Sequence, residues 1–279
     1  MRTAIASRDE SEIFAANRAA GHIALVAGAA RGRTRRIRVQ EDGSLRVRFP
    51  NATPDALEAV LVNTAGGMTG GDRFSIDISL EPRASMVVGT AAAEKIYRST
   101  GPAAEVAVKL DVGAGSRLVW LPQETILFDR ANLSRRIEID LADDASLLLC
   151  ESVVFGRSAM GEAVAQGRFM DRWRLRRGGR LIFAETVRLD GAIDRKLAEA
   201  AAAAGAIAMA TLLIVPGDDG MAATVRGLVA TFRGEVGVSV WNGLALARFC
   251  ARDGAALRHD LIGVLTALGR CSLPRLWLS

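Results

Sequence analysis

The sequence has few of the residues on which most enzymes depend. Its 279 residues include two histidines, one tyrosine and three cysteines, and aromatic residues make up 5 % of the chain. Histidine is the commonest acid-base group at neutral pH and a common metal ligand, yet neither His22 nor His259 lies in a metal-binding or triad motif. Nucleophile-elbow, HExxH and dinucleotide-binding motifs are also missing. The sequence therefore predicts a protein that is not an enzyme.

Cysteines and long apolar runs are equally scarce. Cys150, Cys250 and Cys271 are odd in number and far apart, which argues against a disulfide framework and against paired-cysteine metal sites. The longest weakly apolar span, residues 197–215, is interrupted by Glu199 and does not predict a membrane helix. The first residues carry acidic side chains where a signal peptide would have its apolar core, so we expect a cytoplasmic protein.

Lysine is rare, and arginine carries most of the positive charge. Only three of the 36 basic residues are lysines, and the formal net charge is +5. The arginines form two clusters, which are Arg31, Arg33, Arg35, Arg36 and Arg38, and then Arg168, Arg172, Arg174, Arg176, Arg177 and Arg180. Such clusters suggest nucleic acid or an acidic partner. Since the chain offers few aromatic rings on which bases could stack, we expect no nucleic-acid binding.

A glycine-rich stretch, NTAGGMTGGD, runs from Asn63 to Asp72. Gly66 and Gly71 have the spacing of a phosphate-binding loop, but Asp72 stands where that loop needs lysine, and a carboxylate would repel phosphate. Residues 73–80 then alternate in polarity, which predicts a strand rather than the helix of a phosphate loop. Two alternatives remain, an ordinary structural turn and a turn that holds a carboxylate where a cation passes.

A strand-turn-strand unit recurs about every thirty residues along the first two thirds of the chain. The segments IDISL-EPRAS-MVVGT, VAVKLDV-GAGS-RLVWL, IEIDL-ADDA-SLLLCE and WRL-RRGG-RLIFAE align with turn centres near 83, 114, 144 and 178, and an earlier unit is centred near 53. No helical pattern separates the copies. The repeat predicts a mainly β fold of stacked hairpin layers, resembling a β-helix or solenoid.

Polar residues recur at one place in this repeat. Five positions after the turn exits at Ser85, Ser116, Ser146 and Arg180 stand Thr90, Leu121, Glu151 and Glu185. If the strands stack, Thr90, Glu151 and Glu185 fall near one another. Burying unpaired carboxylates costs several kcal/mol per ion, so the column indicates water-filled space or bound cations. The alternative is that each glutamate pairs with an arginine at a layer edge.

The pattern of the sequence changes near residue 190, where the strand-turn-strand repeat ends. We predict a β-helical body over residues 1–190 and a smaller α/β cap over 191–279, together forming one continuous domain. The cap is expected to contain helices over 194–204, 221–232 and 253–270, a buried strand over 206–215, and a hairpin of strands 236–241 and 244–250 around Asn242-Gly243.

Five motifs, in order, carry a resemblance to a known family. They are NTAGGMTGGD, TAAAEKIYRS, LPQETILFDRA, ESVVFGRSAMGE and RLIFAETVRLDG. Together they resemble the urease accessory protein UreD family, also called UreH, while the C-terminal third matches in length and pattern. The resemblance implies a cytoplasmic, non-enzymatic scaffold that binds UreF, which recruits the GTPase UreG, and a complex that docks on apo-urease and delivers nickel. It also implies a water-filled passage for the metal.

The resemblance implies that Asp72, Glu151 and Glu185, with Thr90, line this passage. Carboxylates, hydroxyls and water hold a divalent ion loosely enough to release it, whereas histidine and cysteine would trap it. We therefore expect nickel in transit and no tightly bound cofactor. The sequence departs from the family at Ala91, where many relatives are expected to carry glutamine, so a polar role for that position stays open.

Two further hypotheses compete with the scaffold. The first is a basic β-solenoid module that binds RNA or an acidic protein through the arginine clusters, which salt-sensitive retention on RNA would reveal. The second is a hydrolase that uses Glu151 and Glu185 as acid and base, although nothing in the sequence fixes their separation or a substrate pocket.

Overall fold

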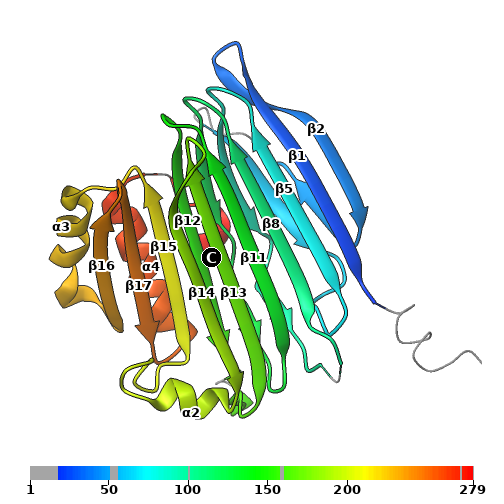
Figure 1. Ribbon diagram of the computed structural model, residues 1–279, viewed down its shortest axis with the longest axis vertical. Coiled ribbons are helices and arrows are strands. Elements are labelled where there is room, and N and C mark those ends of the chain that lie inside the picture. The colour runs from blue at the N-terminus through cyan, green and yellow to red at the C-terminus, as the bar shows by residue number, and fades with distance from the viewer. Residues whose placement is uncertain (1–17, 51–55, 100, 158–159, 271, 279) are drawn as a thin grey trace, which may run out of the picture.

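Strands with alternating burial build two β-sheets that lie face to face (Figure 1). In Arg73–Leu80, for example, every second side chain is buried, as expected for a strand with one face on a core. The computed structural model describes residues 18–50, 56–99, 101–157, 160–270 and 272–278. The predicted mainly β architecture is confirmed.

Sheet A has seven strands. In spatial order they are β14 (Arg180–Gly191), β13 (Gly167–Arg177), β11 (Asn132–Leu141), β8 (Ala104–Val112), β5 (Arg73–Leu80), β1 (Ala20–Ala30) and β2 (Arg33–Gly43).

Sheet B has ten strands. Its main path is β16 (Glu235–Trp241), β17 (Leu244–Ala251), β15 (Ala208–Val215), β12 (Ser146–Phe155), β9 (Arg117–Leu121), β6 (Ser85–Thr90), β4 (Leu57–Asn63) and β3 (Leu45–Arg48). Two short strands lie off that path, with β7 (Glu94–Ile96) paired to β10 (Thr125–Leu127), and β10 paired to β12.

The repeat corresponds to coils of a solenoid. The chain passes from sheet A to sheet B in each of three units, β5 to β6, β8 to β9 and β11 to β12, and consecutive units pair in parallel within each sheet. The short strands β7 and β10 form a third side where the chain returns from sheet B to sheet A. The turns predicted near 83, 114 and 144 are therefore crossings between the sheets, and stacking the crossings gives the β-helix-like body.

The fourth predicted copy is different. β13 and β14 form an antiparallel hairpin within sheet A, in which Trp173 lies opposite Glu185. Its turn contains Gly178 and Gly179, with φ of 53° and 77°, and two successive residues with positive φ fold a tight hairpin instead of a crossing. Glu185 consequently does not continue the column begun by Thr90 and Glu151.

The register also corrects the second copy by one residue. Ser85 and Ser146 both pair with Arg117, not with Ser116. Counting five residues from Arg117 reaches Pro122, so Leu121 was the wrong equivalent. The turn predicted near residue 53 lies in 51–55, outside the described residues.

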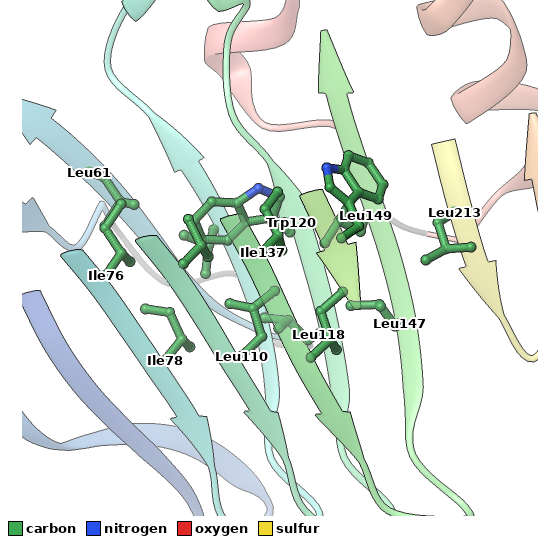
Figure 2. Packing of buried hydrophobic residues seen from close by; sticks show 14 of the residues in the cluster. Leu61, Ile76, Ile78, Leu110, Leu118, Trp120, Ile137, Leu147, Leu149 and Leu213 are labelled. Atoms are coloured by element: carbon green, nitrogen blue, oxygen red, sulfur yellow. The ribbon is translucent and has the colours of Figure 1, made fainter. Parts of the chain in front are cut away.

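Two apolar cores hold the molecule together. The larger lies between the sheets, where Ile78, Leu110, Leu118 and Leu149 are almost fully buried (Figure 2). The second lies on the outer face of sheet B, where the C-terminal helices pack. These helices are α2 (Ile193–Ala198), α3 (Asp219–Gly227), the 3₁₀ helix η2 (Val229–Thr231), α4 (Gly254–Leu268) and α5 (Arg275–Leu278).

The C-terminal part extends sheet B. The hairpin around Asn242-Gly243 and the long helix after it are confirmed as β16, β17 and α4. α4 begins where the Asp253 side chain accepts a hydrogen bond from the Ala256 amide at 2.7 Å, and it ends at Gly269 in the left-handed conformation. The helices predicted over 194–204 and 221–232 are shorter, because the first ends at Ala198 and the second divides into α3 and η2. Among the described helices, none is long and apolar enough to cross a membrane.

Candidate functional site

A cavity of about 260 Å³ lies inside the solenoid, between the two sheets and the short strands β7 and β10. Its walls are mostly apolar, with Ile76 and Val108 from sheet A and Leu61 from sheet B. The polar residues that line it are Asn63, Thr90, Glu94, Lys95, Gln123, Thr125, Arg135 and Glu151. A space of this size with several polar groups can hold several water molecules.

Arg135 forms the floor of the cavity together with two carboxylates. Its guanidinium donates to Asp171 through Nε at 3.0 Å and through Nη2 at 2.5 Å, and Nη1 pairs with Glu151. The three side chains are each at most 8 % exposed. The indole nitrogen of Trp120 donates to the other oxygen of Glu151 at 2.8 Å. The group joins β11 and β13 of sheet A to β9 and β12 of sheet B.

The ion pairs of Arg135 and the Trp120 hydrogen bond stabilise charged side chains that burial would otherwise disfavour. Burial raises the pKa of Glu151, and the charge of Arg135 and the Trp120 hydrogen bond oppose that rise. Burial alone would lower the pKa of Arg135, but the charges of Asp171 and Glu151 raise it above its ordinary value. Arg135 therefore stays a cation, and the floor of the cavity is an ion-paired set rather than a free carboxylate column.

Glu94 is the cavity's second carboxylate. It lies on β7, opposite Thr125 of β10, and Asn63 Nδ2 donates to it at 2.9 Å. Burial raises the pKa of Glu94 from 4.5 to about 7, against the opposing effect of the Asn63 hydrogen bond and with a smaller contribution from the charge of Asp72. Near neutral pH this carboxyl group is therefore poised to gain or lose a proton.

Thr90 also lies at this cavity, as part of its hydrogen-bonded rim. Its hydroxyl donates to the Ala92 carbonyl at 3.0 Å and accepts from the Gln123 amide at 2.8 Å. Ala91 and Ala92 beside it are exposed and also line the cavity. The structure thus brings Thr90 and Glu151 to one space, as the repeat predicted, and adds Glu94 to them.

Asp72 does not line the cavity. Its carboxylate is 4 % exposed and accepts hydrogen bonds from the Ala19 amide at 2.8 Å and the Thr69 amide at 2.7 Å. One oxygen closes the glycine-rich turn on Thr69 and the other ties that turn to Ala19, just before β1, which is the geometry of the structural-turn alternative.

Glu185 lies elsewhere. It is on β14 and forms an ion pair with Arg248 of β17, whereas Glu151 is paired with Arg135 in the interior. The arginine-paired alternative thus describes both glutamates, although only Glu185 has its partner near the surface. The structure does not bring the two glutamates into one acid-base site.

Three residues of this site were missed by the sequence analysis, namely Arg135, Asp171 and Glu94. For the first two, the sequence pattern contains a signal that could have identified them. Arg135 occupies an inward position of β11, in phase with Leu133 and Ile137, and Asp171 does the same on β13. A charged residue in the apolar phase of a half-buried strand predicts a buried ion pair. Glu94 gave no such signal because β7 has only three residues.

Neither of the two described cysteines, Cys150 and Cys250, lines this cavity. Cys150 belongs to the helix-covered core on the other face of β12, and burial raises the pKa of its thiol. Within the part of the chain that the structure describes, there is no group of three or more histidine, cysteine, aspartate or glutamate side chains able to hold a metal ion.

Comparison with known proteins gives a consistent family. The model of the family described as UreD urease accessory protein matches residues 19–278. The urease accessory protein UreD of Bradyrhizobium diazoefficiens is 58 % identical over 269 residues, covering 96 % of this chain and 97 % of its own. Its counterpart in Rhodopseudomonas palustris strain CGA009 is 57 % identical over 269 residues, with 96 % of both chains covered.

Proposed function

The chain belongs to the UreD family of urease accessory proteins, and we propose on that premise that it is a non-catalytic scaffold for nickel insertion. The scaffold joins a UreF protein, and through it the GTPase UreG, to apo-urease in the cytoplasm. The observation that carries this proposal is the family match over nearly the whole chain. Neither a membrane nor nucleic acid has a part in it.

The proposal extends to nickel in transit through the cavity. Glu94, Thr90 and Glu151 supply carboxylate and hydroxyl oxygens along one cavity, and such ligands suit a partly hydrated divalent ion that must be released again. A cation that reaches Glu94 displaces a proton near neutral pH, which weakens its net binding. Arg135 repels the cation and competes with it for Glu151, so nickel is held loosely at the floor.

Asp72 and Glu185 have secondary parts in this proposal. Asp72 acts through the turn that it closes and through its charge on Glu94. Glu185, paired with Arg248, contributes to the metal's path only if nickel also passes along the opposite edge of the sandwich. Substituting Asp72 alone and Glu185 alone would show separately whether each residue affects nickel delivery.

One feature favours a second candidate, a module that binds RNA or an acidic protein. β2 is an exposed edge strand, and its arginines form no ion pair with any described residue. Arg35 and Arg38 illustrate this, since each lies on the outward side of the strand. Retention on poly-U RNA with a steep dependence on salt would favour this candidate.

The scaffold proposal is tested by reconstitution. Urease is produced in cells that carry its accessory genes with and without this chain, and the nickel content of purified urease is measured. We expect apo-urease without the chain, and nickel-loaded urease with a tagged chain that co-purifies with UreF and UreG. Full nickel loading without the chain, or a tagged chain that binds none of these proteins, would refute the scaffold.

A further inference from the structure

The outer faces of the two sheets differ in polarity. On sheet A, outward residues such as Lys109, Arg136 and Glu138 are charged and exposed, as expected for a face in water. On sheet B, the outward positions of β4, β6 and β9 hold Val62, Val87 and Val119, of which Val119 is already buried in the helix-covered core while Val62 and Val87 are half-buried. A row of valines on an outer face is expected to be covered.

Next to these valines, the outer face of sheet B is covered by a helix layer. Leu257, Leu261 and Val264 of α4 pack with Ala247 and Phe249 of β17 in the second core. The layer ends at α5, whose Leu276 lines the same groove as Val62 of β4 and Val87 of β6. The apolar outer face of sheet B therefore extends beyond the part that the C-terminal helices cover.

An open groove of about 1060 Å³ occupies the uncovered part. Its floor is the valine row, and one wall is the C-terminal segment with Leu273 and Leu276. That wall is fixed in place, since Trp277 Nε1 donates to the Leu121 carbonyl at 2.9 Å and Gln123 Nε2 donates to the Leu276 carbonyl at 3.0 Å. The groove is thus formed before any partner arrives.

The rim of the groove is positively charged. Among the described residues that line it, four are arginines, Arg48, Arg117, Arg270 and Arg275, and one, Glu58, is acidic. Arg117 and Arg275 are exposed and form no ion pair with any described residue. A partner with acidic residues beside an apolar stripe would complement both features.

We infer that this groove binds an amphipathic helix of a partner protein, with its apolar side on the valines and its carboxylates on the rim arginines. The inference rests on the proposed scaffold function, and it names the surface and the chemistry of one partner contact. A helix is the fitting occupant because it continues the layer that α4 begins on the same sheet face. Side chains at i, i+3, i+4 and i+7 would fill the groove, and arginine suits paired contacts to carboxylates.

The test combines cross-linking with charge reversal. A photo-reactive residue replaces Val87 in the groove, or Lys109 on sheet A as the matched control, and each chain is mixed with purified UreF or apo-urease. We expect a cross-link from position 87 only, to a helical segment flanked by aspartate or glutamate. The double variant Arg117→Glu/Arg275→Glu should weaken that complex about tenfold at low salt, whereas Arg136→Glu/Arg172→Glu on sheet A should bind within about twofold.

The outcomes distinguish failure of helix binding in the groove from failure of the proposed scaffold function. If wild-type protein binds UreF or urease but reversal of the rim changes nothing, the groove is not the docking surface. Cross-links from position 87 to an extended segment, to a second copy of this chain or to RNA would also overturn the inference. If the wild-type chain binds neither protein, the scaffold proposal fails and the inference falls with it. Thermal unfolding of each variant confirms that the fold is intact.

Discussion

At the scale of residues, the buried set of Arg135, Glu151 and Asp171 explains how charges survive inside an apolar solenoid. Each carboxylate oxygen of Glu151 and Asp171 has a partner, either Arg135 or the Trp120 indole. Because the partners come from both sheets, the set also fixes how the sheets face each other. If nickel passes through the cavity as proposed, it passes beside an ion pair and not along bare carboxylates.

Removing the central cation should be costly. Arg135→Met leaves Glu151 and Asp171 buried without a counter-charge, so we expect the free energy of unfolding to fall by about 3–5 kcal/mol. Urea unfolding at pH 7 measures this, with Arg136→Met on the outer face as the control, expected within about 0.5 kcal/mol of wild type. Equal stability of the two variants would show that Arg135 is not holding these carboxylates.

Glu94 should make stability depend on pH. Its folded-state pKa of about 7 lies above its ordinary value of 4.5, so the folded state binds the extra proton. That contribution is complete below pH 4.5 and is lost as pH rises to 7. Glu94→Gln should remove it and stabilise the protein at pH 8 by about 1–2 kcal/mol, a figure reduced for partial solvent exposure. Parallel wild-type and variant stability curves between pH 5 and 8 would contradict this assignment; Glu138→Gln is the control.

At the scale of elements, the glycine-rich turn positions β7 and with it Glu94. The Met68 amide donates to the Lys95 carbonyl and the Tyr97 amide donates to the Met68 carbonyl, both at 2.7 Å. Gly67 has a φ of 148°, and a Cβ there would lie 2.4 Å from the Tyr97 ring. The stretch that resembled a phosphate loop is therefore a brace for the cavity wall.

Two neighbouring glycines provide a matched test of that brace. Gly67→Ala combines backbone strain with a clash and should lower stability by about 2–4 kcal/mol. Gly66→Ala keeps a positive φ of 76° but meets no atom within 4 Å, so its cost should stay near 1 kcal/mol. Thermal unfolding compares them, and the account fails at this turn if Gly66→Ala proves the more damaging change.

The elements also show which features the sequence could specify. Strong alternation predicted β5, and Asn242-Gly243 predicted the β16–β17 hairpin, since both signals are local. The spacing of the turns could not show whether a turn crosses between the sheets or folds a hairpin within one sheet. That difference depends on the φ angles of Gly178 and Gly179. That is why Glu185 was assigned to the wrong column.

At the scale of the whole molecule, the solenoid offers one interior space and one large surface groove on different sides of sheet B. Thr90 and Glu151 could be brought together from the repeat, because a fixed period places equivalent residues on stacked coils. The pairing of Glu151 with Arg135 could not, because it joins two sheets whose relative register no local pattern encodes. The groove could not be predicted from the sequence either, because it depends on where the C-terminal segment lies over sheet B.

Passage of nickel through the cavity is best tested by the nickel content of urease matured beside the double variant Glu94→Gln/Glu151→Gln. Only preparations in which the accessory complex still co-purifies are compared, with Glu138→Gln as the control. We expect about tenfold less nickel in urease matured with the double variant and a normal nickel content with the control. Normal nickel with an intact complex would contradict the passage of nickel through this cavity.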